Sequence, residues 1–374
     1  MTTDIQELAV NALRCLDIGG QLHSGNELVV IYDGDNSFKK GLAGAIALQA
    51  AKRNILTSIH DVDKLRREHE TNEKVLAALT DETRFNTTNP LQRNAINMLG
   101  TDARYAAIRR PVTLDLLLPQ KAYVLQFPFT QQETAEAILA IDPAEVEGTA
   151  LAMKRDLDQA TKIRIDSGDS LMEYSVNSAL RWVPSIGLIK RYSPLDEQGQ
   201  PKGGWGNPPG EIFTSFAHSL EDYKLMEGAI QFDAFTLGKV LPRAQKFSVS
   251  ISKGKVDLVD FVVYNPHLAK KRMAALLEEF RKDEFAVHPG ELGIGLVDGL
   301  SLGKTTDTLT LEKIRGTLHV GFGYDENDRG TGGFVKSKSH NDCGIRRPFL
   351  EARIGGQWKT ILDGYGGSPY FAAA

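Results

Sequence analysis

The sequence predicts a chain of two domains, an α/β domain followed by an α+β domain. In the first 160 residues, short β-branched runs alternate with stretches of helical spacing. Beyond residue 161 the pattern changes to short strands separated by glycine turns. A length of 374 residues with 41% hydrophobic content is enough for two cores. We therefore predict an α/β N-terminal domain over residues 1–160 and an α+β C-terminal domain over residues 161–374.

The N-terminal domain is predicted to contain three strand–helix units. Strands are expected at residues 27–33, 55–60 and 122–127, with helices after them at 38–52, 62–79 and 130–139. Such alternation favours a parallel sheet. No G-x-G-x-x-G motif follows any of these strands, so a dinucleotide cofactor is not expected. A helix over residues 143–161 is predicted to join the two domains.

The C-terminal domain is predicted to be built mainly from short strands. They are expected at residues 162–165, 172–176, 247–251 and 258–263, and a helix is expected at 268–280. The turn sequence Ser252-Lys253-Gly254-Lys255 between two of these strands predicts an antiparallel hairpin.

Composition limits the partners of the protein. Lys+Arg 44 against Asp+Glu 48 gives a net charge of -4 without a long run of one sign, so neither nucleic acid nor a membrane surface is an expected partner. No apolar run approaches the ~18 residues of a membrane-spanning helix. Two cysteines cannot build a disulfide framework, and the start of the chain lacks the features of a signal peptide. We expect a cytoplasmic protein that acts on a peptide or another small molecule.

The strongest chemical signal lies in residues 337–343. If this segment is a strand, its two-residue period places His340 and Asp342 on one face. Glu211, Glu291 and His319 lie upstream in glycine-punctuated segments. Histidines and carboxylates without cysteine suit zinc, manganese, cobalt or ferrous iron.

Each of these residues also has an ordinary structural interpretation. Glutamates such as Glu211 and Glu291, which follow glycine, are common in solvated turns, and His319 beside Val320 is compatible with a core histidine. The pair His340 and Asp342 is more specific, because an imidazole and a carboxylate on one face serve metal binding directly. From the residues alone, both interpretations stay open.

Four motifs, taken together and in order, resemble a known family. They are Asn207-Pro208-Pro209-Gly210-Glu211-Ile212-Phe213-Thr214, Gly290-Glu291-Leu292, Gly316-Thr317-Leu318-His319 and Ser337 through Asp342. In content and order they are similar to the motifs of the M29 metallopeptidases, the aminopeptidase T family, and the resemblance extends from about residue 162 to 364.

This resemblance implies an aminopeptidase T-like fold, a homodimer and a pair of divalent ions. The implied metal ligands are Glu211, Glu291, His319, His340 and Asp342. Glu211 would act as a ligand or as the general base. Tyr324 is the nearest match to a tyrosine of the family's site and would donate a hydrogen bond to the oxyanion, although it lies closer to His319 than in the family pattern.

The first functional hypothesis is therefore a metal-dependent aminopeptidase with two ions of zinc, cobalt or manganese. The alternative is a mononuclear non-haem iron enzyme, similar to the 2,5-dihydroxypyridine dioxygenases that share the fold, or a biosynthetic enzyme. Glu291, His340 and Asp342 would then hold Fe(II), although the usual set contains two histidines. A binding protein without chemistry is the third possibility. The presence of Glu211 favours the peptidase.

Overall fold

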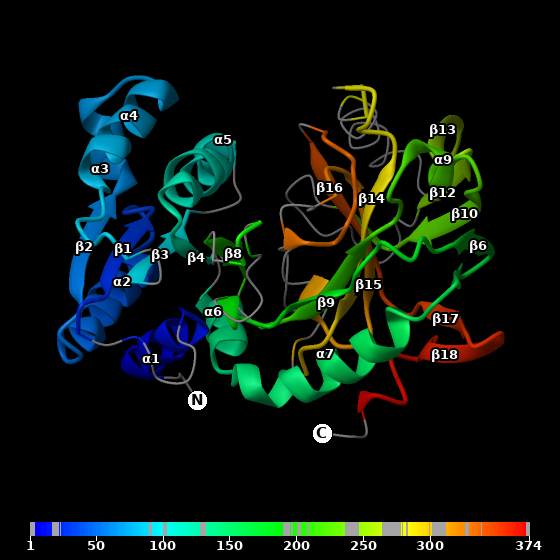
Figure 1. The fold of residues 1–374 in the computed structure, drawn as a ribbon. Coiled ribbons are helices and arrows are strands. Elements are labelled where there is room, and N and C mark those ends of the chain that lie inside the picture. The colour runs from blue at the N-terminus through cyan, green and yellow to red at the C-terminus, as the bar shows by residue number, and fades with distance from the viewer. Residues whose placement is uncertain are drawn as a thin grey trace. The chain divides into compact units, whose positions relative to one another are not determined.

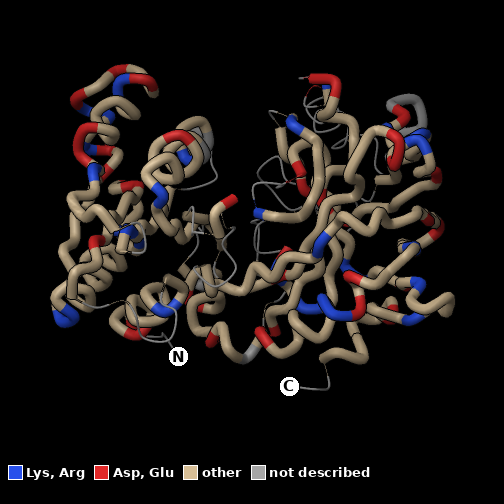
Figure 2. Tube along the Cα trace, viewed as in Figure 1, with Lys and Arg blue, Asp and Glu red and all other residues tan. Residues whose placement is uncertain are grey.

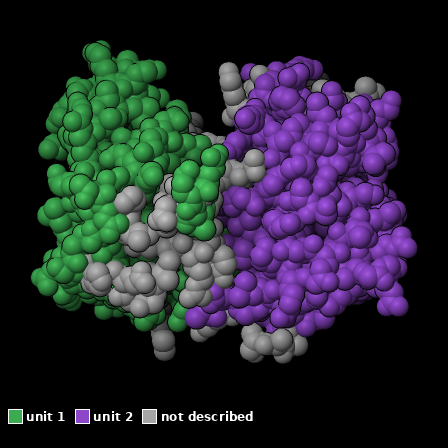
Figure 3. All heavy atoms as spheres, viewed as in Figure 1, with its two compact units in different colours: residues 1–143, 185–209 green, residues 144–184, 210–374 purple. Residues whose placement is uncertain are grey.

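The architecture is taken from a computed structural model, in which the chain forms two compact units (Figure 3). The structure describes residues 4–16, 22, 24–89, 92–99, 103–127, 132–189, 195, 197–199, 203–207, 209–235, 247–263, 278, 280–281, 283–298, 300, 312–325, 329–337 and 339–371. Unit 1 comprises Met1–Pro143 and Ser185–Pro209, and unit 2 comprises Ala144–Pro184 and Gly210–Ala374. The compact units divide after Pro143, and the chain returns once to unit 1, whereas the sequence predicted a single boundary at residue 160.

Unit 1 is an α/β unit around a parallel sheet (Figure 1). Its elements are α1 (Ile5–Leu16), β1 (Glu27–Tyr32), α2 (Ser37–Ala51), β2 (Leu56–Asp61), α3 (Val62–Glu68), α4 (Asn72–Glu82), β3 (Arg93–Met98), α5 (Ala103–Pro111), η2 (Val112–Leu117), η3 (Leu118–Gln120), β4 (Tyr123–Gln126), α6 (Gln132–Leu139) and β8 (Gly204–Gly206). The strand order is β2-β1-β3-β4-β8, and every pair of neighbours is parallel. The predicted parallel sheet is confirmed.

The predicted helix over residues 62–79 was wrong, because the chain breaks it into α3 and α4. The cap at His69 is extended, with φ -131° and ψ 127°, and the side chain of Thr71 then accepts a hydrogen bond from the Lys74 backbone to start α4. A threonine at this position supplies an acceptor for one of the free N–H groups of a new helix. The strand β3 and the helix α1 were not predicted at all.

Unit 2 contains α7 (Pro143–Leu157) and two antiparallel sheets. The strands are β5 (Lys162–Ser167), β6 (Ser170–Ser175), β7 (Val183–Ser185), β9 (Glu211–Ser215), β10 (Glu227–Phe232), β11 (Ala234–Phe235), β12 (Phe247–Ser252), β13 (Lys255–Val263), β14 (Pro289–Gly295), β15 (Leu318–Gly323), β16 (His340–Ile345), β17 (Phe349–Ile354) and β18 (Gln357–Asp363), with the short helix α9 (Leu220–Tyr223) between β9 and β10. One sheet has the order β13-β12-β10-β6-β5-β17-β18. The other, which we call the site sheet, has the order β11-β16-β15-β14-β9-β7 (Figure 1).

The predicted hairpin at Lys253-Gly254 is confirmed, since β12 and β13 pair in antiparallel fashion around it. The turn places Lys253 at φ 49° and Gly254 at φ 68°, and glycine adopts such values without steric cost. The helix predicted over residues 268–280 falls outside the described residues, apart from positions 278 and 280.

The two sheets of unit 2 meet through the apolar face of the site sheet. Phe322 of β15 lies against Phe232 of β10, with ring centroids 5.9 Å apart, and Phe232 lies against Phe247 of β12. Leu292, Val320 and Phe322 are fully buried. Because side chains alternate along a strand, the opposite face of β14 and β15 is left to a different set of residues.

Charged residues of both signs are interspersed along the traces of both units (Figure 2). Cys15 and Cys343 are both free and buried. Among the described residues, no helix combines the length and the apolar character needed to span a membrane.

Candidate metal centre

Four neighbouring strands of the site sheet carry the predicted ligands. Glu211 begins β9, Glu291 lies in β14, His319 lies in β15, and His340 and Asp342 lie in β16. The register pairs Glu291 with Gly321 and Gly321 with Asp342, so the two carboxylates stand in one row across three strands. The sheet therefore gathers on one face residues that are up to 131 positions apart in the chain.

Glycines leave room for these side chains on the same face. A Cβ atom on Gly321 would lie 2.7 Å from His340 Cε1 and 3.0 Å from Asp342 Oδ1, and one on Gly293 would collide with the His319 ring. The ligands and the glycines alternate with the apolar residues of the opposite face. The glycine-punctuated segments noted in the sequence are thus glycine-lined strand faces.

The five predicted ligands form a connected group of contacts. His319 Nε2 lies 3.1 Å from Glu291 Oε1 and 3.7 Å from Glu211 Oε2. His340 Nε2 lies 3.0 Å from Asp342 Oδ1 and 3.6 Å from Glu291 Oε2. Glu291 thus stands between the two histidines. The same-face arrangement predicted for His340 and Asp342 is what the strand geometry produces.

A backbone contact fixes the orientation of His340. Its Nδ1 lies 2.7 Å from the carbonyl oxygen of Tyr324. Because that oxygen can only accept, Nδ1 carries the proton, and Nε2 is the ring nitrogen that faces Asp342. The main chain of Tyr324 therefore positions a ligand, whereas the predicted role of the Tyr324 hydroxyl stays a prediction.

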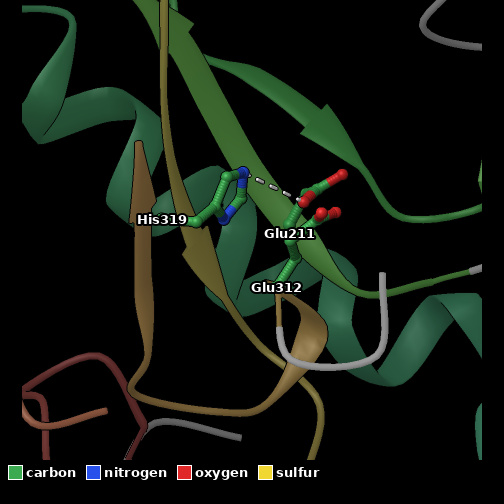
Figure 4. Close-up of side chains that lie close together, drawn as sticks. All are labelled: Glu211, Glu312 and His319. Atoms are coloured by element: carbon green, nitrogen blue, oxygen red, sulfur yellow. Dashed lines mark ion pairs between the residues drawn. The ribbon is translucent and has the colours of Figure 1, made fainter. Parts of the chain in front are cut away.

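Two residues of the site were missed by the sequence reasoning, Glu312 and Lys313. Glu211, Glu312 and His319 each offer a ligand atom, and these atoms all lie within 4.8 Å of one another (Figure 4). The buried ammonium of Lys313 forms ion pairs with Glu211 and, at 3.4 Å, with Glu312. Adjacent glutamate and lysine residues are common on protein surfaces, so no local pattern predicts that this pair lies in a core.

Burial and neighbouring charges shift the pKa values of the site in opposite directions. Burial raises the pKa of Glu211, but the charges of Lys313 and His319 outweigh it and leave this pKa below its usual value. Burial together with the charge of Asp342 raises the pKa of Glu312 well above its usual value. Burial lowers the pKa of His319, but its hydrogen bond to Glu291 and the charge of Glu211 reverse the shift and raise it.

The residues present fit a divalent ion. Among the described residues, the buried atoms Glu211 Oε2, Glu312 Oε1 and His319 Nδ1 have no hydrogen-bond partner, which is costly unless something else binds them. Four buried carboxyl groups, those of Glu211, Glu291, Glu312 and Asp342, gather there, and burial together with their crowding holds the pKa of Glu312 well above its usual value, so that Glu312 would lose its proton when a cation binds. Oxygen and imidazole donors gathered in this way suit a borderline divalent cation.

Comparison with known proteins supports the fold assignment. The chain has an aminopeptidase T-like fold, as the resemblance in sequence predicted. The solved structure that it matches is wild-type AmpT from Thermus thermophilus, with a TM-score of 0.66 and 14% sequence identity over 97% of this chain and 99% of that chain. No family model matches the chain, and no curated protein sequence matches it. At 14% identity the similarity establishes the fold alone.

Proposed function

We propose that the protein is a metal-dependent hydrolase that removes N-terminal residues from peptides. The observation that carries this proposal is the set of buried carboxylate and imidazole atoms on one face of the site sheet, some without a hydrogen-bond partner, in a fold shared with AmpT. Clustered buried charges of like sign are costly for folding, and such clusters are retained where they bind a cation.

Two ion positions are proposed. Glu291, His340 and Asp342 would form one, and Glu211, Glu312 and His319 would form the other. Zinc, cobalt or manganese matches these oxygen and nitrogen donors. When bound, the ions would polarise the scissile carbonyl and lower the pKa of the attacking water.

The protein groups around the ions would bind the ions and orient the reacting groups. The lowered pKa of Glu211 favours its role as a ligand over a role as general base, since a base at neutral pH needs a pKa nearer 7. His340 is held through Nδ1 by the Tyr324 carbonyl, and its Nε2 faces the other two proposed ligands of this position. The Tyr324 hydroxyl is proposed to donate a hydrogen bond to the developing oxyanion.

The test is hydrolysis of a panel of short peptides by the purified protein. Peptides with a free N-terminus should be cleaved, and the same peptides with an acetylated N-terminus should resist. Activity should vanish with a chelator and return with zinc, cobalt or manganese. Glu211→Gln should reduce kcat and the bound metal together, because Glu211 is proposed as a ligand.

The same preparation tests the iron hypothesis. One iron per chain, oxygen uptake with a hydroxylated heteroaromatic acid and no peptide cleavage would replace the peptidase by a dioxygenase. Glu211, Glu312 and His319 lie close together and offer a second set of ligands. This second set counts against a single iron held by one facial triad.

The homodimer and the cytoplasmic location remain proposals from the sequence. Sedimentation equilibrium at micromolar concentration tests the first, since a dimer should sediment at twice the chain mass of 41.1 kDa. Cell fractionation tests the second.

A further inference from the structure

Lys313 is an unusual feature of the candidate centre because it places a fixed positive charge among ligands for a positive ion. Its side chain is fully buried. The ammonium contacts Glu211 and lies 3.4 Å from Glu312 Oε2. Both carboxylates belong to the group of three that also contains His319. Lys313 thus contacts the same two carboxylates that a metal ion at this position would bind.

The position of Lys313 is fixed by the fold. A Cβ atom on Gly210 would lie 2.7 Å from Lys313 Cγ, so the stem of the lysine lies directly against the backbone of Gly210. The carbonyl oxygen of Lys313 accepts a hydrogen bond from Val297 N, 2.8 Å away, and the carbonyl of Gly210 accepts one from Leu296 N. Hydrogen bonds fix the backbone segments on both sides of the Lys313 side chain. The ammonium therefore cannot reach solvent, as that of a surface lysine can.

The lysine contacts only one of the two proposed ion positions. Its ion pairs are with Glu211 and Glu312, whereas His340 pairs with Asp342 and with Glu291. An ion bound by Glu291, His340 and Asp342 would share none of its ligands with the ammonium. An ion bound by Glu211, Glu312 and His319 would share two ligands with the ammonium and would be repelled by it.

We propose that Lys313 makes the two ion positions unequal, so that one divalent ion binds tightly to Glu291, His340 and Asp342 and a second binds weakly to Glu211, Glu312 and His319. This inference rests on the proposed metal-dependent function. The ammonium pairs with Glu211 and Glu312 while the second position is empty. The second ion binds only as it takes over these two carboxylates from Lys313.

The test is titration of the chelator-stripped full chain with Zn²⁺ alone, followed by calorimetry and by equilibrium dialysis with metal analysis. The wild type should bind two ions with dissociation constants about 100-fold apart, the order expected from repulsion between an ammonium and a divalent ion that share ligands. Asp342→Asn should remove the tight step, and Glu211→Gln the weak one.

Lys313→Gln removes the charge and keeps a donor for Glu211. In this variant the second ion should bind within about tenfold of the first, as expected once the repulsion is gone. Lys359→Gln is the matched control, since Lys359 forms an ion pair with Asp156 away from the ligands, and it should leave both steps unchanged. If Lys313→Gln does not fold, the wild-type titration still decides between equal and unequal steps.

Each outcome has a distinct meaning. Two equal steps in the wild type, or an unchanged second step in Lys313→Gln, would overturn the role of Lys313 and leave metal-dependent hydrolysis intact. No bound zinc in the wild type would overturn the proposed function and this inference together. Unequal steps that become equal in Lys313→Gln, with no peptide cleavage, would support the inference and refute the peptidase.

Discussion

Each unit buries one lysine among carboxylates, and the two surroundings differ in charge balance. Among the described residues, Lys39 in unit 1 and Lys313 in unit 2 are the lysines that are fully buried. Lys39 follows β1, and its ammonium lies 2.8 Å from Asp33 Oδ2. Lys313 instead lies beside Glu211 and Glu312 in a group of four buried carboxylates.

Carboxylates at the start of α3, also in unit 1, are occupied by donors of the protein itself. Asp61 caps α3 by accepting from two backbone N–H groups, and Asp63 accepts from the hydroxyl of Tyr105 and from the Asp35 backbone. In unit 2, Glu211 Oε2 and Glu312 Oε1 have no such donor among the described residues. A balanced cluster is explained by folding alone, whereas an unbalanced cluster indicates that a cation belongs to the functional protein.

The largest expected effect separates these two clusters by one substitution in each. Asp33→Asn removes the charge that faces the buried Lys39 ammonium and should cost about 3–5 kcal/mol of unfolding free energy. Asp342→Asn, measured on chelated protein, should cost less, about 1–2 kcal/mol, because the lost attraction to His340 is partly offset by relief of the repulsion with Glu312, and it should remove the tight zinc-binding step. Urea unfolding measures both.

Similar losses of stability in the two variants would remove the distinction between a structural and a functional cluster. Asp342→Ala, which also deletes the amide, serves as a check that the asparagine has not built a new hydrogen bond. Circular dichroism should show that Asp33→Asn, although weakened, keeps its secondary structure at low temperature.

Metal removal should affect unit 2 and leave unit 1 unchanged. An ion at 100 times its dissociation constant stabilises the folded state by about 2.7 kcal/mol, and chelation removes this contribution. Hydrogen exchange shows which strands lose stability when the ion is removed. Amide protons of β14, β15 and β16 should exchange faster after chelation, while those of β1 and β3 should keep their rates. Faster exchange in β1 would mean that the clusters are not independent.

Much of the site could be predicted because its residues lie on strands with a strict period. His340 and Asp342 are two positions apart, so their common face followed from strand geometry alone. Glu211, Glu291 and His319 stood out because glycines surround them, and the structure explains two of these glycines, Gly293 and Gly321, by the close approach of predicted ligand side chains. The parallel sheet of unit 1 followed in the same way from the alternation of strand and helix patterns.

What could not be predicted depends on contacts between distant segments. Glu312 and Lys313 look like a surface pair, and only the packing of Lys313 against Gly210 brings them to Glu211. The return of residues 185–209 to unit 1 depends on β8 pairing with β4, which no local pattern encodes. The break at residues 69–71 depends on one threonine cap within an otherwise periodic run.

A smaller effect is expected from adding one methyl group to each unit. Gly321→Ala would place its Cβ between His340, Asp342 and Glu291, and overpacking of this kind costs about 1–3 kcal/mol. It should also weaken zinc binding, because the ligands must move apart. Gly44→Ala in α2 meets no atom within 4 Å and should instead stabilise the protein by about 0.5–1 kcal/mol.

Thermal melts with and without zinc separate the two alanine variants. Gly321→Ala should lose most of the zinc-induced rise in Tm. Gly44→Ala should keep the full zinc-induced rise, and its Tm without zinc should be higher than that of the wild type. A normal zinc response in Gly321→Ala would show that this row of the site sheet does not hold the ion.

The smallest expected effect is a pH dependence that has opposite signs at two buried histidines of unit 2. Burial lowers the pKa of His288, so the unfolded chain takes up a proton first, and stability should fall as pH drops below about 6.5. The pKa of His319 is raised because its hydrogen bond to Glu291 and the charge of Glu211 outweigh burial. The contribution of His319 to the free energy of unfolding is complete below about pH 6.5 and is lost as the pH rises through the pKa of His319 in the folded protein.

Chelated protein should therefore be most stable near pH 6.5, and zinc should shift this optimum upward, because a bound ion needs a deprotonated His319 and replaces the proton. Calorimetric Tm values between pH 5 and 8.5, with and without zinc, measure both limbs. His288→Gln should flatten the acidic limb only, and His319→Gln the alkaline limb of the chelated protein only. If the alkaline limb is the same with and without zinc, His319 is not a ligand, and the cluster around Lys313 is as structural as the one around Lys39.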